Sequence, residues 1–127
     1  MLHIPTLYIS ETAERGRGVF VADDIEKGSL IEICPLILIP PKDIKAIDTT
    51  IIHDYYFWCP NEEGWAFVPL GYGCLYNHSH DSNADTEHDF EERLMRITAK
   101  RRIEAGEEIF IDYCGGDQKN PLWFDVK

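Results

Sequence analysis

The hydrophobic residues of this 127-residue chain fall mostly in short runs separated by turn residues, a pattern typical of β-strands. The longest β-branched run covers residues 30–39 and is interrupted by Pro35. Because proline cannot donate to a strand ladder, we expect an edge or a bend there. Runs at 56–58 and 65–68 predict one hairpin, and residues 84–90 and 93–100 predict a second one.

One segment has the period of a helix instead. Between residues 42 and 55, hydrophobic side chains recur every three to four positions, which predicts one amphipathic helix. Two similar stretches, Ile25–Ile31 and Ile103–Ile109, each contain a glycine turn that leads directly into a strand. No fixed period recurs along the chain. The pattern therefore predicts a single, mainly β domain over residues 1–127 with non-local strand pairing.

Charge narrows the classes of partner. The chain has 23 acidic and 12 basic residues, a formal net charge of −11. Such a surface is unsuited to nucleic acid and suits a cationic partner such as a lysine-rich peptide, although it serves equally well to keep a small domain in solution. The sequence shows no signal peptide and no apolar run of membrane-spanning length. The cysteines are widely spaced and are expected to be reduced thiols of an intracellular protein: Cys34, Cys59, Cys74 and Cys114.

Three short motifs carry candidate chemistry: Gly16-Arg17-Gly18, Asn77-His78-Ser79 and the strand that ends in Asp112-Tyr113. The glycines permit a close backbone approach to a ligand, and Arg17 could pair with a carboxylate. Asn77 can both donate to and accept from an amino-acid ligand. Each motif alone is more often structural, as a turn, a hydrogen-bonded histidine or a buried tyrosine.

A metal site is the competing interpretation of the histidines. His78, His80 and His88, with Asp81, offer side chains that can bind zinc, and they would fit a metal-dependent hydrolase. Their spacing matches no ordered ligand motif, so we expect no metal.

Together, the three motifs resemble those of the SET-domain lysine methyltransferases. The glycine motif of that family matches Gly16-Arg17-Gly18, its asparagine–histidine–serine motif with a later asparagine matches residues 77–79 and Asn83, and its glutamate-rich strand ending in tyrosine matches residues 107–113. The resemblance covers residues 5–116 and is greatest to the minimal viral and bacterial members. It implies a β-clip fold with a knot-like crossing of the Asn77-His78 segment and the strand ending at Tyr113, and one or two short helices.

The resemblance also implies a reaction, the transfer of a methyl group from S-adenosylmethionine to a lysine amine, with S-adenosylhomocysteine as the second product. Tyr113 would be the catalytic tyrosine. Arg17, Gly18, Asn77 and His78 would bind the cofactor, and Tyr72 and Tyr76 would line the lysine channel. The acceptor would be a basic protein, for which a histone in chromatin is the commonest choice in the family.

The chain departs from many eukaryotic members, whose zinc-binding cysteine clusters flank the domain. Only Cys114 follows Tyr113, so no such cluster can form there. We therefore expect the channel to be closed by the tail, residues 117–127, or by a second subunit of a homodimer. In the tail, Trp123 could stack on the adenine of the cofactor, or it could cap the core.

Two expectations stay open at this stage. The alternative to an enzyme is a non-catalytic module of the same fold that binds basic peptides through its acidic surface. An intact asparagine–histidine pair and tyrosine favour the enzyme. The expected location is intracellular, cytoplasmic for a bacterial chain and nuclear for a eukaryotic or viral one, with a secreted effector as a further option.

Overall fold

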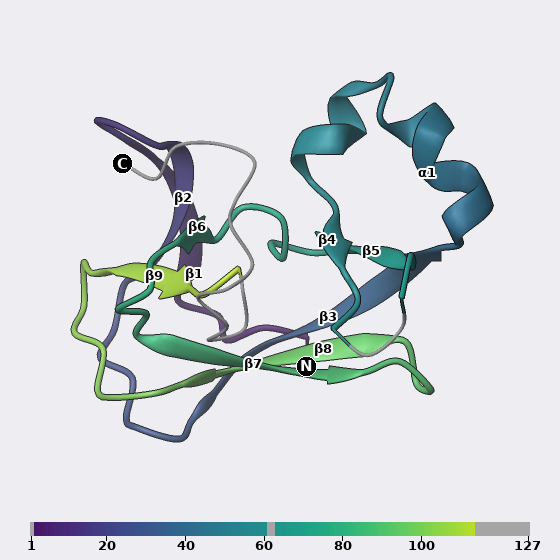
Figure 1. The fold of residues 1–127 in the computed structure, drawn as a ribbon. Helices are drawn as coiled ribbons and strands as arrows, with labels where there is room; N and C mark the ends of the chain where they lie inside the picture. The colour runs from purple at the N-terminus through teal and green to yellow at the C-terminus, as the bar shows by residue number, and fades with distance from the viewer. Residues whose placement is uncertain (1, 61–62, 114–127) are drawn as a thin grey trace.

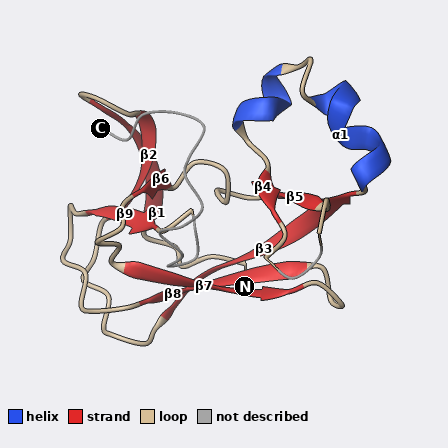
Figure 2. Cartoon of the chain, in the orientation of Figure 1, coloured by secondary structure: helices blue, strands red, loops and turns tan. Residues whose placement is uncertain are grey.

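The computed structural model describes residues 2–60 and 63–113. It is built of two sheets with two short helical segments at one end (Figures 1 and 2). The prediction of a mainly β fold with one or two short helices is confirmed. The tail, including Trp123, lies outside the described residues.

The larger sheet has five strands in the order β4-β5-β3-β8-β7 and is antiparallel throughout. Its strands are β3 (Leu30–Ile39), β4 (Phe57–Trp58), β5 (Ala66–Pro69), β7 (Ala84–Asp89) and β8 (Leu94–Ala99). Both predicted hairpins are confirmed, since β4 pairs with β5 and β7 pairs with β8.

The smaller sheet has four strands in the order β1-β2-β9-β6. Its strands are β1 (Leu7–Thr12), β2 (Gly16–Val21), β6 (Asn77–His78) and β9 (Glu108–Ile111). The β6–β9 pair is parallel, whereas the other two pairs are antiparallel. A parallel pair requires a crossover connection, which here is the whole β7–β8 hairpin and the segment after it. The site motifs meet at this pair.

The expectation of an edge at Pro35 was wrong. Pro35 lies within β3, a central strand of the larger sheet. Residues 30–35 of this strand pair with β8, and residues 36–39 pair with β5. Pro35 is thus the residue at which β3 changes partners, a position where a missing N–H breaks no continuous ladder.

The predicted single helix is divided into α1 (Pro41–Ile47) and a 3-10 turn, η1 (Ile51–Asp54). The Thr50 side chain accepts a hydrogen bond from the Ile52 N–H and so caps a new start. Ile44 and Ile47 pack on a small cluster beside β5, while Ile51 is 71% exposed. The helical period therefore holds only for the first half of the segment.

The two similar glycine turns contact each other. Ile25 and Ile103 form an isolated antiparallel bridge, with N–H to carbonyl distances of 2.7 and 2.9 Å. The glycine of each turn has a positive φ, +86° at Gly28 and +90° at Gly106, as such turns require. Ile25 and Ile103 are both buried in the main core, which lies between the sheets.

Among the described residues, none of the helices has the length and apolar character of a membrane span.

Candidate functional site

The site is built on the parallel pairing of β6 with β9. Asn77 lies beside Phe110 and His78 beside Ile111, so residues more than thirty positions apart share one sheet. The Ser79 N–H extends the ladder by donating to the Ile111 carbonyl at 3.0 Å. This pairing brings together the asparagine–histidine motif and the strand that ends at Tyr113, as the sequence predicted.

Asn83 fastens the same strand from its side chain. Its amide nitrogen donates to the Glu108 carbonyl at 2.9 Å, and its amide oxygen accepts the Phe110 N–H at 2.8 Å. One buried amide thus satisfies a backbone acceptor and a backbone donor of β9, as a neighbouring strand would.

Gly18 lies against a polar pair formed by Asn77 and Glu108. The Asn77 amide nitrogen donates to Glu108 Oε2 at 2.6 Å and lies 3.2 Å from the Arg17 carbonyl. A Cβ atom at Gly18 would lie 2.5 Å from Glu108 Oε2 and 3.0 Å from the Asn77 nitrogen. The glycine therefore allows its backbone to lie close to the Asn77 and Glu108 side chains, while the approach to a ligand stays a prediction.

His78 is buried, with only 3% of its surface exposed, and two hydrogen bonds hold it in place. Its Nδ1 accepts the Tyr113 N–H at 2.9 Å, and its carbonyl accepts a hydrogen bond from Arg15 Nη1 at 2.6 Å. Because Nδ1 accepts, Nε2 carries the proton in the neutral ring, and among the described residues it has no partner. Burial, followed by the charge of His80, lowers the pKa of His78, which keeps the ring neutral.

The hydroxyl of Tyr113 is directed at a backbone carbonyl. It donates to the Tyr76 carbonyl oxygen at 2.5 Å. The ring meets Phe57 edge-on, with centroids 5.1 Å apart, and the His78 ring at the same distance. Burial, followed by the neighbouring Cys74, raises the pKa of Tyr113 to about 12. The phenol is therefore a neutral hydrogen-bond donor at neutral pH.

Tyr72 and Tyr76, the two residues predicted for the lysine channel, differ in burial. The Tyr76 ring has no exposed surface, and its hydroxyl donates to Glu32 Oε1 at 2.6 Å, so the ring belongs to the core and its backbone carbonyl is what reaches Tyr113. The half-buried Tyr72 ring stacks on His3 with centroids 5.1 Å apart. Phe57 on β4 is the aromatic ring in contact with Tyr113 that sequence reasoning missed.

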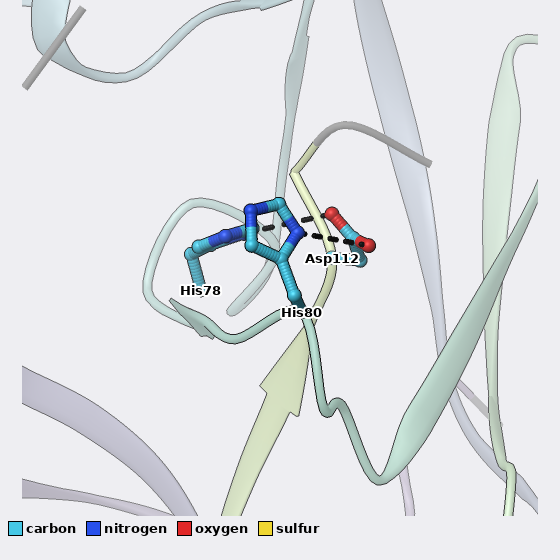
Figure 3. A group of neighbouring side chains, drawn as sticks. All are labelled: His78, His80 and Asp112. Carbon is cyan, nitrogen blue, oxygen red and sulfur yellow. Dashed lines mark hydrogen bonds and ion pairs between the residues drawn. The ribbon is translucent and has the colours of Figure 1, made fainter. Parts of the chain in front are cut away.

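The histidines group differently from the metal set considered above. His88 lies on β7, stacked on Phe90, whereas His78 and His80 lie beside Asp112 (Figure 3). Asp112 Oδ1 is 3.7 Å from His78 Nδ1, and Oδ2 is 3.5 Å from His80 Nδ1. However, His78 Nδ1 already accepts the Tyr113 N–H, so metal binding through this atom would break that bond. His78 Nδ1 therefore holds the Tyr113 backbone, and the opposite ring nitrogen, Nε2, is the one without a hydrogen-bond partner among the described residues.

The residues around Gly18 fit the amino-acid end of S-adenosylmethionine. The Asn77 amide oxygen and the Glu108 carboxylate can accept from an ammonium group, and the exposed Arg17 side chain can pair with a carboxylate. The buried Nε2–H of His78, which has no hydrogen-bond partner among the described residues, is a donor that a bound ligand would satisfy. Glu108 lies in the glutamate-rich strand of the third motif, but neither it nor Arg15 was predicted to bind the cofactor, because a charged residue on a strand or in a turn does not by itself indicate a ligand contact.

Comparison with known proteins gives the family. Residues 16–114 match the model of the SET domain. The chain is 31% identical over 121 residues to a Schizosaccharomyces pombe protein named histone-lysine N-methyltransferase, H3 lysine-37 specific; the match covers 94% of this chain and 77% of that protein.

Solved structures agree. A crystal structure of a Plasmodium falciparum protein, described as a candidate histone methyltransferase, superposes with a TM-score of 0.72 at 33% identity, covering 91% of this chain and 97% of that one. A humanized mutant of Chaetomium thermophilum Polycomb Repressive Complex 2 matches with a TM-score of 0.70 at 25% identity, over 89% of this chain and 15% of that one. With its three motifs assembled around one parallel strand pair, the chain belongs to the SET-domain family of protein-lysine methyltransferases.

Proposed function

We propose that this chain transfers a methyl group from S-adenosylmethionine to the side-chain amine of a lysine in a basic protein, and that histone H3 is the first substrate to test. The observation that carries the proposal is the Tyr113 hydroxyl, held by the Tyr76 carbonyl next to the Asn77-His78 motif. The methyltransferase activity follows from the family and its relatives. The choice of histone rests on the name of the S. pombe relative and on the charge of −11, which suits a lysine-rich tail.

S-adenosylmethionine, when bound, supplies a methyl group on a positively charged sulfur, with no need for a metal. Residues of this chain would hold it at its amino-acid end: Arg17, the backbone at Gly18, Asn77 and Glu108. The carboxylate of Glu108 lies 2.6 Å from the Asn77 amide and would offset the positive charge of the ligand. We further propose that the backbone of His78 and the unpaired Nε2–H line the same pocket.

The acceptor lysine has to be neutral to react. A free lysine amine has a pKa of about 10.4 and is almost fully protonated at pH 7. Desolvation beside the Phe57 and Tyr113 rings, which meet edge-on, would lower that pKa, and the positive charge of the sulfonium would lower it further. The Tyr113 hydroxyl, whose pKa is raised to about 12, stays protonated at neutral pH and would orient the amine.

A direct test is methyl transfer from labelled S-adenosylmethionine to recombinant histones, with the modified lysine identified by mass spectrometry. Tyr113→Phe should reduce kcat by at least about 100-fold, because loss of alignment by about 1 Å has effects of that size. Its dissociation constant for S-adenosylmethionine should stay within about twofold of that of the unaltered protein. The matched control is Tyr8→Phe, the same change at a 39% exposed residue on β1, which should leave kcat unaltered.

Two results would contradict the proposal. Full activity of Tyr113→Phe would remove the assigned role of the hydroxyl. Binding of basic peptides by the unaltered protein, without measurable binding of S-adenosylmethionine in a calorimetric titration, would favour a non-catalytic peptide-binding module.

A further inference from the structure

Glu32 is a buried carboxylate outside the three motifs. It lies on β3, and only 1% of its surface is exposed. A buried charge of this kind is costly unless hydrogen bonds compensate it. The partners of Glu32 are therefore informative about its role.

Both oxygens of Glu32 bind the segment that leads into the Asn77-His78 motif. Oε2 accepts the Tyr72 N–H at 2.9 Å, and Oε1 accepts the Tyr76 hydroxyl at 2.6 Å. Gly71 has a φ of +67°, and a Cβ atom there would lie 2.3 Å from Oε2. Glycine at this position therefore permits both the turn and the close approach of its backbone to the carboxylate.

Tyr76 connects Glu32 to the site through two different groups. Its hydroxyl binds Glu32, and its backbone carbonyl accepts the hydroxyl of Tyr113 at 2.5 Å. The ring between these groups is fully buried, so it has little freedom to turn. Burial, followed by the charge of Glu32, raises the pKa of the Cys34 thiol on the same strand.

We propose that Glu32 is a positioning residue for methyl transfer: it fixes Tyr76, and through the Tyr76 carbonyl it sets the direction of the Tyr113 hydroxyl. This inference rests on the proposed function, in which that hydroxyl orients the lysine amine. Glu32 itself touches neither the cofactor pocket at Gly18 nor the Tyr113 hydroxyl among the contacts of the described residues. Glu32 should therefore affect the rate of methyl transfer, kcat, and not the binding of either substrate.

Kinetics of three variants test the proposal: Tyr76→Phe, Glu32→Leu and Glu32→Gln, each assayed well below its melting temperature. The first two break the connection and should lower kcat by about tenfold or more, with the KM for both substrates within about twofold. Glu32→Gln should keep kcat within about threefold, because its amide oxygen can accept the Tyr72 N–H while its nitrogen donates to the Tyr76 hydroxyl.

The matched control is Tyr56→Phe. Tyr56 is also a buried tyrosine, 3% exposed, whose hydroxyl donates to a carboxylate, Asp48 Oδ1, at 2.8 Å. That pair lies beside α1, so its loss should lower stability without lowering kcat. An equal fall of kcat in Tyr56→Phe, or an unaltered kcat in Tyr76→Phe and Glu32→Leu, would overturn the proposal.

A second measurement does not depend on activity. With isotope-labelled tyrosine, the NMR resonance of the Tyr113 ring carbon that bears the hydroxyl should move in Tyr76→Phe and Glu32→Leu and stay in place in Tyr56→Phe. A resonance that stays in place in all three variants would refute the connection even if the unaltered protein methylated no tested substrate. Inactivity of the unaltered protein together with the expected shifts would count against the proposed function and support the connection.

Discussion

At the scale of single residues, the site depends on close contacts between polar groups and backbone. Gly18 is the clearest case, because the Asn77–Glu108 pair occupies the space where a side chain would begin. The conformation of Gly18 is not the reason for the glycine, since its φ is not positive, whereas Gly16 has a φ of +69° and open space around it. The two glycines of one motif thus serve different purposes.

This difference gives a prediction for Gly18→Ala. The added methyl group should displace Glu108 or Asn77 and weaken the binding of S-adenosylmethionine by about tenfold or more, an effect of roughly 1.4 kcal/mol. Isothermal titration calorimetry measures the dissociation constant. Gly16→Ala is the control: backbone strain should lower its stability by about 1 kcal/mol, while cofactor affinity stays within about twofold. Equal affinity losses in both variants would contradict this separation.

At the scale of elements, β6 and β9 are short strands, so additional hydrogen bonds are needed to stabilise their pairing. β6 has two residues and β9 has four. Asn83 supplies two further hydrogen bonds to the backbone of β9, at Glu108 and Phe110. One side chain therefore fastens the strand that carries the polypeptide to Tyr113.

Asn83→Ala should lower the free energy of unfolding by about 2–4 kcal/mol, because it leaves a backbone carbonyl and an N–H without partners. Urea unfolding followed by tryptophan fluorescence gives this value. The exposed Asp85→Ala, two residues away on β7, should change it by less than about 0.5 kcal/mol. If Asn83→Ala also changed the free energy of unfolding by less than about 0.5 kcal/mol, β6 and β9 would stay paired without the amide.

At the scale of the whole molecule, two histidines in different sheets couple stability to pH. The pKa of His78 is lowered by burial and then by His80, with Arg15 acting in the same direction and Asp112 opposing it. The pKa of His88, whose ring stacks on Phe90, is lowered by burial. Both rings titrate at a lower pH in the folded chain than in the unfolded one.

Stability should therefore fall as the pH drops below about 6.5, since the unfolded chain then binds protons that the folded chain does not. Each histidine contributes at most about 1.4 kcal/mol per pH unit. The free energy of unfolding, measured from pH 7.5 to 5.5, shows the slope, and His88→Phe should reduce it while keeping the ring contact with Phe90. An unaltered slope in that variant would mean that His88 does not contribute.

The two hairpins and the identity of the motifs could be predicted from the sequence. These are local features: both hairpins, the first half of the helix and the three motifs of the family. They can be predicted because alternation, turn residues and short spacings involve only residues that are close together in the sequence. Pro35 and the end of α1 were predicted less well, since a change of strand partner and the exposure of Ile51 depend on distant segments.

The contacts of each site residue could be known only from the folded chain. The parallel pairing of β6 with β9 turns the Tyr76 carbonyl toward Tyr113, and the packing of β3 against residues 70–76 places Glu32 on the Tyr76 hydroxyl. Those contacts join residues 37 and 44 positions apart. No local pattern encodes them, because they arise when the two sheets fold around one core. For the same reason, the sequence could not show that the Tyr76 ring is buried in the core while its carbonyl contacts Tyr113.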